Sequence, residues 1–191
     1  MKTVKAKPQT PEAEKEYVEF MKRYKAHAEA ANRVALTILV WGPSPDRTCP
    51  AARKRKKIKE ALKEKGHNAL FSEDIKLKSV DLLDMSQKSK EHAQAKAADL
   101  IIVLVEDSKG ALAEFHDFCG DPQIAPKMFV LVPRRFRKGY SASGALRDLA
   151  DAHGGVFWYG DDDLKRCKVC AKAIQRAQAL RLIRAQAGSF Q

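Results

Sequence analysis

The run DLIIVLV at residues 99–105 decides the fold of this chain. Its aliphatic residues follow one another without a polar interruption, which is typical of a β-strand buried on both faces. The run ends in EDSKG (106–110), and a helical pattern, ALAEFHDF (111–118), follows at once. Ligands of open parallel sheets bind just beyond the carboxyl ends of the strands. The sequence therefore predicts that Glu114, in the first turn of this helix, lies beside such a binding edge, and we take it as the candidate catalytic residue.

The composition indicates a soluble globular protein that is large enough to bury a core. The chain has 191 residues, of which 45% are hydrophobic and 31% are charged. No apolar run approaches the roughly 18 residues that a membrane span needs. The basic start, MKTVKAKP (1–8), lacks the apolar core of a signal peptide. We therefore expect a cytoplasmic protein with no membrane partner.

The charge balance is strongly basic, with 36 Lys and Arg against 24 Asp and Glu and a net charge of +12. Such a chain is attracted to phosphate groups on a nucleotide, a nucleic acid or a membrane surface. The run RKRKK (53–57) concentrates this charge at the start of a predicted helix. It is interpreted as a solvated helix face, or as a source of one or two cations that reach a bound phosphate.

The four cysteines give no sign of a disulfide framework. Cys49 and Cys119 stand alone, whereas Cys167 and Cys170 form a C-x-x-C inside a helical pattern. Residues three apart share a helix face, so we expect this pair to pack inward, with metal binding or redox chemistry as the alternative. No second pair stands at zinc-site spacing, and the sequence predicts no metal site.

Four more apolar runs predict strands, at residues 34–41, 67–71, 127–133 and 156–159. Helical patterns fill 10–32, 50–65, 79–97, 143–152 and 161–187. Strands that alternate with helices predict right-handed crossovers and a parallel sheet, so we expect a three-layer, flavodoxin-like α/β fold with strand order 2-1-3-4-5. Residues 1–33 form a tail and an extra N-terminal helix, and residues 34–187 form a single nucleotide-processing domain. The apolar stripe of the first helix packs on the sheet or forms a subunit contact.

In this strand order, the loops at 41–50, 71–77 and 106–110 meet at one crevice. The candidate substrate contacts there are Trp41, Gly42, Pro43, Ser44, Glu73, Asp74, Asp107, Ser108, Gly110 and Asp117. Trp41 offers a flat face for a base, although a tryptophan at a strand end is also a common core residue. Arg134 and Arg135 follow the fourth predicted strand; they bind a pyrophosphate, or belong to a solvated loop or a nucleic-acid contact.

The run SKGALAE (108–114) resembles the strand-loop-helix signature of nucleoside 2-deoxyribosyltransferase-like enzymes. It is also similar to the catalytic region of Toll/interleukin-1 receptor (TIR) enzymes that cleave NAD. The segments WGP (41–43) and FSED (71–74) fit the same pattern, and the resemblance covers about residues 34–184. In both families a glutamate at the helix start works at the anomeric carbon of a ribose, which implies that role for Glu114. Deoxyribosyltransferases generally carry aspartate where this chain has Ser108, so their substrate-hydroxyl contact and their exact reaction do not carry over.

The chemistry of N-glycosidic bonds favours NAD among the substrates that the resemblance implies. Cleavage passes through an oxocarbenium-like state that one carboxylate beside the anomeric carbon stabilises or captures. A neutral purine also needs an acid to protonate it, whereas nicotinamide leaves as a neutral molecule from a cationic ring. Glu73, Asp74 and Asp107 remain candidates for a second carboxylate. Glu114 itself has an alternative interpretation as an acid that interacts with the helix dipole.

We therefore expect an N-glycosidase that cleaves the nicotinamide–ribose bond of NAD or a related nucleotide, with NAD as substrate and no resident cofactor. The resemblance implies an effector of bacterial anti-phage defence that is held inactive until assembly, hence a homo-oligomer or a regulatory protein or nucleoprotein partner. Two alternatives stay open. One is a nucleoside 2-deoxyribosyltransferase; the other is a non-catalytic nucleotide-sensing or nucleic-acid-binding module that uses the basic surface.

Overall fold

The computed structural model describes residues 10–75, 85–106, 115, 118–138 and 144–187. The chain divides into two compact units. The α/β unit is Ala35–Gln178, and the helical unit joins Met1–Val34 to Ala179–Gln191. The domain boundaries expected from the sequence stay a prediction. None of the helices in the described ranges has a stretch long and apolar enough to cross a bilayer.

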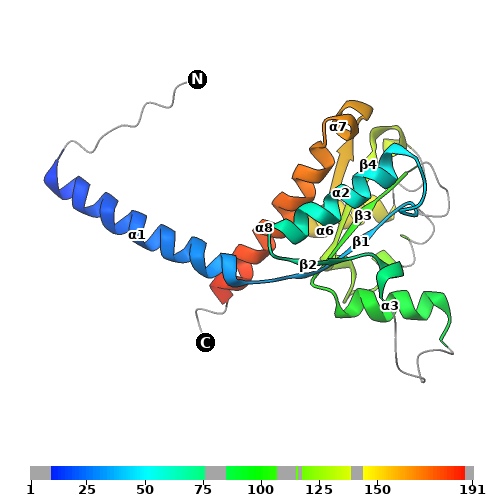
Figure 1. Ribbon diagram of the computed structural model, residues 1–191, viewed down its shortest axis with the longest axis horizontal. Helices are drawn as coiled ribbons and strands as arrows, with labels where there is room; N and C mark the ends of the chain where they lie inside the picture. The colour runs from blue at the N-terminus through cyan, green and yellow to red at the C-terminus, as the bar shows by residue number, and fades with distance from the viewer. Residues whose placement is uncertain (1–9, 76–84, 107–114, 116–117, 139–143, 188–191) are drawn as a thin grey trace. The chain divides into compact units, whose positions relative to one another are not determined.

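The α/β unit is built on one sheet of five parallel strands in the order β2-β1-β3-β4-β5 (Figure 1). The strands are β1 (Thr37–Trp41), β2 (Asn68–Leu70), β3 (Leu100–Leu104), β4 (Met128–Pro133) and β5 (Val156–Tyr159). This order and the parallel pairing confirm the fold class that the apolar runs predict. The switch point lies between β1 and β3, where the chain first turns back across the sheet.

The central strands are buried along their whole length, as continuous aliphatic runs require. Trp41 pairs with Val103 in the register of β1 and β3, so these two strands end side by side. The Thr37 backbone N–H donates to the Asp99 carboxylate at 2.7 Å, at the start of the same two strands. The Tyr159 hydroxyl donates to the Val105 carbonyl at 2.6 Å, just past the end of β3. Polar contacts at both ends of β3 therefore fix it in the sheet.

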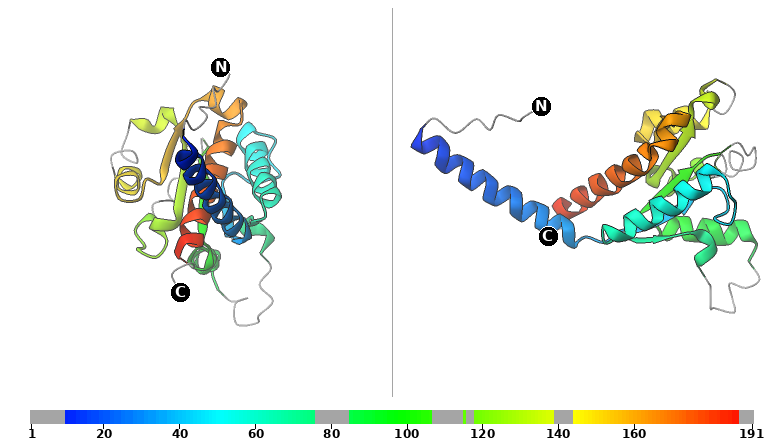
Figure 2. Two further views of the ribbon diagram at one scale, coloured as in Figure 1. Left: turned by 90° about the vertical axis from the view of Figure 1, so that its left-hand side faces the viewer. Right: turned by 45° about the horizontal axis from the view of Figure 1, so that its top comes forward.

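Helices cover both faces of the sheet. They are α2 (Pro50–Glu64), α3 (Gln87–Ala97), α6 (Ala145–His153), α7 (Asp161–Lys165) and α8 (Lys168–Ala187), with short 3₁₀ turns η1 (Ser72–Asp74), η3 (Ala125–Lys127) and η4 (Arg134–Arg137). Figure 2 shows α2 and α6 on opposite sides of the sheet, as right-handed crossovers in this strand order require. The first part of the helix expected at 79–97, and most of the one expected at 111–118, lie outside the described residues.

The last predicted helix is broken, which corrects the expectation of one continuous helix from residue 161. Residues Arg166 and Cys167 separate α7 from α8. Cys167 has a φ of 57°, in the left-handed region that residues other than glycine seldom adopt. This single residue therefore ends the first helix and redirects the chain into the second.

The helical unit contains α1 (Pro11–Arg33), whose start follows the sequence signals. The Thr10 hydroxyl accepts a hydrogen bond from the Ala13 backbone N–H at 3.2 Å, and Pro11 occupies the first helical turn. The apolar side chains Tyr17, Phe20 and Tyr24 are exposed along this helix. The packing of this stripe on the sheet stays a prediction.

Candidate functional site

A cavity of about 190 Å³ lies at the carboxyl edge of β1 and β3, where the sequence predicts a binding crevice. Its described walls come from the ends of β1 and β3, from η1, from α3 and from the segment after β3. The lining residues are Trp41, Gly42, Arg55, Ser72, Glu73, Gln87, Glu91, Val103, Phe115 and Phe118. Whole-ligand pockets usually measure roughly 300–1,000 Å³. A ligand as long as a dinucleotide would therefore occupy this cavity with one end only.

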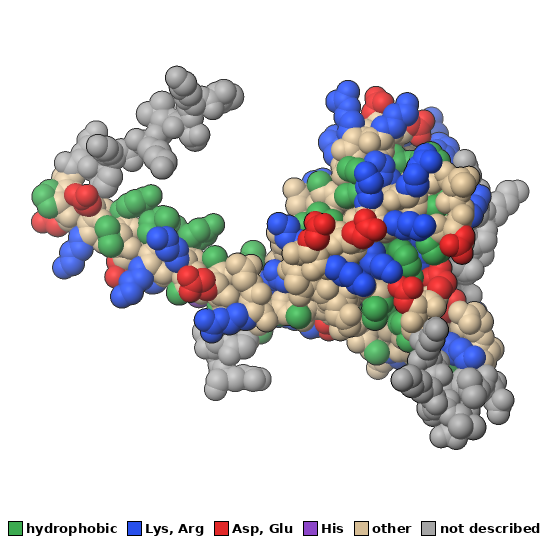
Figure 3. Space-filling model, in the orientation of Figure 1, with side chains coloured by type: hydrophobic (Ala, Val, Ile, Leu, Met, Phe, Trp, Pro, Cys, Tyr) green, Lys and Arg blue, Asp and Glu red, His purple; other side chains and the backbone are tan. Residues whose placement is uncertain are grey.

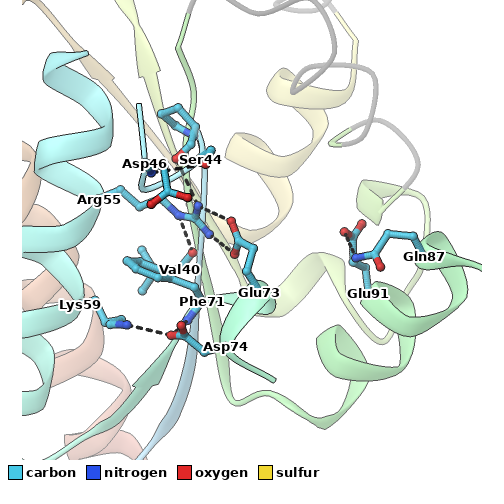
Figure 4. A network of polar contacts seen from close by, with 11 residues as sticks. Val40, Ser44, Asp46, Arg55, Lys59, Phe71, Glu73, Asp74, Gln87 and Glu91 are labelled. Atoms are coloured by element: carbon cyan, nitrogen blue, oxygen red, sulfur yellow. Dashed lines mark hydrogen bonds and ion pairs between the residues drawn. The ribbon is translucent and has the colours of Figure 1, made fainter. Parts of the chain in front are cut away.

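The Arg55 guanidinium holds one wall of the cavity together (Figure 4). This side chain is 1% exposed and donates to the Val40 carbonyl at 2.9 Å and to the Pro43 carbonyl at 3.1 Å. It also forms a bidentate ion pair with Glu73, with N···O distances of 2.7 and 2.8 Å. These hydrogen bonds from Arg55 hold the pKa of the Glu73 carboxyl below its ordinary value. The end of β1, the turn after it and η1 are thus tied to one buried cation.

The position of Arg55 differs from both interpretations of the basic run at 53–57, whereas Arg53, Lys56 and Lys57 are exposed, as a solvated helix face requires. A phosphate contact of these other cations stays a prediction. Arg55 is neither part of a solvated face nor directed at a phosphate, because protein acceptors surround its guanidinium. It lies on the buried stripe of α2 with Ala51, Ile58 and Leu62, at spacings of four, three and four residues. This spacing is a signal by which the sequence could have revealed the burial of Arg55.

Two polar atoms in the cavity wall are buried without a hydrogen-bond partner among the described residues. They are the indole Nε1 of Trp41 and the hydroxyl Oγ of Ser72. An unpaired buried donor costs about 1–3 kcal/mol, so such groups call for a ligand or a water molecule. The Trp41 ring packs on Phe118 with 4.8 Å between ring centroids. The wall therefore combines an aromatic surface with unused hydrogen-bonding capacity, as small-molecule sites commonly do.

Gly42 allows the chain to leave β1 beside the cavity. Its φ is 148°, and a Cβ there would lie 2.7 Å from the Leu104 carbonyl oxygen. Any side chain would therefore collide with the backbone of β3. The glycine is required where the sequence predicts a close approach of a ligand to the backbone.

A second carboxylate reaches the cavity from α3. Gln87 donates to Glu91 at 2.8 Å, one helical turn away, and Figure 4 shows this pair apart from the Arg55–Glu73 pair. Glu91 therefore keeps its carboxylate at the cavity while an amide holds one of its oxygens. The sequence did not indicate Glu91, because a polar residue in a polar helix gives no periodic signal.

The structure brings Trp41, Gly42 and Glu73 to the cavity, among the residues that the sequence proposes as substrate contacts. Pro43 contributes through its carbonyl, which accepts from Arg55. Asp74 instead pairs with Lys59 at 2.7 Å, and this hydrogen bond lowers the pKa of its carboxyl. Ser44 is exposed and accepts from the Asp46 backbone N–H at 3.4 Å.

The remaining candidates lie elsewhere or outside the described residues. Arg134 and Arg135 are exposed and stand 3.8 Å from Asp163 and Asp161, respectively. They do not line the described cavity, so their phosphate-binding role stays a prediction. The candidates outside the described residues are Asp107, Ser108, Gly110, Glu114 and Asp117.

The sequence missed several residues that line the cavity: Arg55, Ser72, Gln87, Glu91, Val103, Phe115 and Phe118. Val103 and Phe115 lie within the quoted run and the helical pattern after it, but both read as core residues. Ser72 adjoins the proposed Glu73, yet a lone serine in a turn has no distinctive pattern.

Together, the parallel sheet and its helices define a three-layer α/β protein with a cavity at the switch point, and the sheet is consistent with a nucleoside deoxyribosyltransferase-like fold. Residues 51–187 match the family described as STM3845 retron effector protein. The chain belongs to this family, whose members are effectors of bacterial anti-phage defence. Comparison with curated proteins finds no significant match.

The Arg55–Glu73 pair predicts a specific loss of stability when its carboxylate is neutralised. In Glu73→Gln the buried guanidinium loses its counter-charge, which costs about 3–5 kcal/mol for a fully buried pair. The Glu73 side chain is 51% exposed, so solvent reduces this cost and we expect the free energy of unfolding to fall by about 2 kcal/mol. Urea unfolding at neutral pH measures the change.

The matched control is Asp74→Asn, which neutralises the adjacent carboxylate of the more exposed Lys59 pair and should cost less than about 1 kcal/mol. The pKa of Glu73 is lowered in the folded protein, so its contribution is present above the ordinary value of 4.5 and is lost as the pH falls through the folded pKa. The difference between wild type and Glu73→Gln should therefore shrink in acid. Equal losses in both variants would contradict the assigned role of the buried cation.

Proposed function

We propose that this retron effector is an N-glycosidase that cleaves the nicotinamide–ribose bond of NAD or a related nucleotide. The observation that carries the proposal is the cavity beyond β1 and β3, which is lined by Trp41 and Ser72, two residues whose buried Nε1 and Oγ atoms have no hydrogen-bond partner among the described residues. A nucleotide matches this lining, because its flat rings can stack on the aromatic side chains and its polar atoms can accept a hydrogen bond from the indole N–H. Membership in a family of defence effectors is consistent with an enzyme that consumes a nucleotide.

Glu114 is the proposed catalytic carboxylate. It immediately precedes Phe115, which lines the cavity, and it belongs to the run SKGALAE that resembles NAD-cleaving and deoxyribosyl-transferring enzymes. A carboxylate at the ribose C1′ stabilises the positive charge that develops when nicotinamide departs. Glu73 and Glu91 are the described acids that line the same cavity, and Glu73 is held by Arg55. The proposal needs one acid at C1′, and the motif favours Glu114.

Glu114→Gln should reduce nicotinamide release from NAD by roughly 10²–10⁴-fold, because the amide cannot stabilise the developing cation. Purified wild type and variant are incubated with NAD, and nicotinamide is quantified by chromatography. Glu60→Gln, which removes an exposed acid on α2, serves as the matched control and should retain wild-type release. If Glu91→Gln abolishes release while Glu114→Gln does not, the catalytic carboxylate lies on α3 instead. Base exchange between a deoxynucleoside and a free purine, with no nicotinamide release, would instead indicate a nucleoside 2-deoxyribosyltransferase.

Trp41 gives a test of ligand binding that does not depend on turnover. Trp41→Phe keeps an aromatic ring against Phe118 but removes the unpartnered N–H, so we expect the Kd for NAD to rise about 3–10-fold. Trp158→Phe is the matched control because Trp158 is partly buried on β5 and is not among the lining residues. In that control Trp41 is the remaining tryptophan of the two in the sequence, so its fluorescence reports ligand entry. An unchanged Kd in Trp41→Phe, or no binding to wild type, would contradict the ligand assignment.

We further propose that the partner of α1 is a second copy of this chain. The exposed fractions of Tyr17, Phe20 and Tyr24 are 54%, 54% and 60%, and their spacing of three and four residues puts them on one face. Figure 3 shows a row of hydrophobic side chains along α1. Such a stripe is typical of a helix that packs on another apolar helix.

The charge pattern of α1 favours an antiparallel pair of identical helices. Residues 11–21 carry four Glu and one Lys, a net charge of −3, whereas residues 22–33 carry four Lys and Arg and one Glu, a net charge of +3. An antiparallel pair centred on Phe20 and Met21 places Tyr17 opposite Tyr24. The same register sets Glu16 near Lys25 and Glu19 near Lys22, whereas a parallel pair would align like charges.

The double variant Lys22→Glu/Lys25→Glu should therefore be monomeric at concentrations at which wild type is dimeric, as measured by sedimentation velocity. Reversing all four positions, with Glu16→Lys and Glu19→Lys added, should restore the dimer because the opposite charges again face each other. A monomeric wild type, or a four-site variant that stays monomeric, would refute this pairing.

A further inference from the structure

The junction between α7 and α8 carries the C-x-x-C pair, of which Cys170 packs inward as the sequence predicts, whereas Cys167 is half-buried and lies outside the helix. Cys167 precedes the first residue of α8, and its carbonyl accepts the Cys170 and Ala171 backbone N–H groups, each at 3.1 Å. Cys167 thus occupies the N-cap position of a 20-residue helix. Its left-handed φ of 57° is strained for a residue with a Cβ. The fold therefore holds this thiol at a strained helix start.

A lysine ammonium from α2 contacts the Cys167 sulfur. Lys54 Nζ lies 2.9 Å from Cys167 Sγ, and the same ammonium donates to the Lys165 carbonyl at 3.1 Å. The Lys54 hydrogen bond lowers the pKa of the Cys167 thiol, and the helix N-terminus favours the thiolate in the same direction. Cys167 is half-buried, whereas Cys170 is buried.

Cys170 has the opposite environment, one helical turn later. It is 7% exposed, and burial raises the pKa of its thiol to about 12. The Cys170 backbone N–H donates to the Cys167 carbonyl, so the two residues belong to one tight turn of the chain. A turn closed by this hydrogen bond keeps the Cα atoms of its first and fourth residues within about 7 Å, a limit that overlaps the range of disulfide-bonded cysteines. The pair thus joins a partly exposed cysteine whose thiolate is stabilised to a buried thiol close to it in the same turn.

We propose that Cys167 and Cys170 form a thiol–disulfide exchange site whose substrates are small, low-molecular-weight disulfides. The Cys167 thiolate attacks one sulfur of the substrate disulfide, forming a mixed disulfide and releasing one thiolate. The Cys170 thiol gives up its proton to a leaving thiolate, and its sulfur attacks Cys167 Sγ, which breaks the mixed disulfide. The products are the Cys167–Cys170 disulfide and two reduced thiols, so two electrons pass from the protein to the substrate.

This site is distinct from the cavity at the β1–β3 edge and does not rest on the proposed glycosidase activity. Neither cysteine is among the cavity-lining residues. The alternative for a C-x-x-C is zinc, but two thiols supply only half of the four ligands of a structural zinc site. The strained backbone and the lysine contact at Cys167 have a direct use in exchange, where one sulfur must be presented as the nucleophile.

The test uses the reduced full chain and oxidised glutathione as the substrate disulfide. We expect wild type to lose two of its four thiols and to lose the mass of two hydrogen atoms, with no glutathione adduct at completion. Cys170→Ser should accumulate a glutathione adduct on Cys167, located by peptide mass spectrometry, because the second step is blocked. Cys167→Ser should leave Cys170 unmodified.

Variants of Lys54 test whether the environment of Cys167 raises its reactivity above that of an ordinary cysteine. Lys54→Met should slow adduct formation at Cys167 by roughly 3–10-fold, since less of the sulfur is present as thiolate, whereas Lys54→Arg keeps the charge and should restore most of the rate. Cys49→Ser is the control, because Cys49 caps α2 through a hydrogen bond from Ala52 that serine also accepts; it should exchange like wild type. Circular dichroism verifies that each variant is folded.

The proposal is overturned if Cys170→Ser forms no adduct at Cys167. It is also overturned if Cys49 or Cys119 reacts as fast as Cys167, or if Lys54→Met reacts at the wild-type rate. Stoichiometric Zn²⁺ binding that is lost in Cys167→Ser and Cys170→Ser would assign the pair to a metal instead.

Discussion

The buried guanidinium of Arg55 is the interaction on which the functional edge of the sheet depends. A cation removed from water is tolerated when it is paired and its donors are hydrogen-bonded. Arg55 pairs with Glu73 and donates four hydrogen bonds, to acceptors from the end of β1, from the turn after β1 and from η1. Moving any of these segments would leave a charge or a carbonyl without its partner. The cost of burying one charge thereby fixes three otherwise separate segments around the cavity.

The cavity itself follows from how parallel strands end. Trp41 and Val103 are paired neighbours, so β1 and β3 stop at the same edge. Beyond that edge the chain must turn away from the sheet, and Gly42 allows the turn where a Cβ would collide with the Leu104 carbonyl. The Trp41 ring then packs on Phe118, and its buried N–H has no partner among the described residues. Packing and strand pairing therefore build the site before any catalytic residue is considered.

The features that were predictable from the sequence are those with a local cause. Uninterrupted aliphatic runs mark buried strands, and their alternation with helices determines the order of the sheet. The burial of Arg55 could also have been predicted, because its spacing from Ile58 and Leu62 continues an apolar stripe. The basic residues on both sides of Arg55 made this stripe difficult to recognise. The break at Cys167 had no such signal: helical residues continue on both sides, and the lysine that contacts its sulfur comes from α2, 113 residues earlier. Glu91 and Ser72 line the cavity because segments distant in the sequence come together there. The local periodicity of the sequence therefore could not indicate either residue.

Helix α2 serves both the cavity and the thiol pair through adjacent residues. Successive helical residues point about 100° apart, so Lys54 reaches the α7–α8 junction while Arg55 reaches the end of β1. The acceptors of Arg55 belong to β1, the following turn and η1, and none of them lies on α7 or α8. Loss of the thiolate at Cys167 would leave Lys54 with the Lys165 carbonyl and every one of these acceptors in place. The geometry of α2 therefore lets the sulfur pair change its oxidation state while the wall of the cavity remains held by the buried arginine.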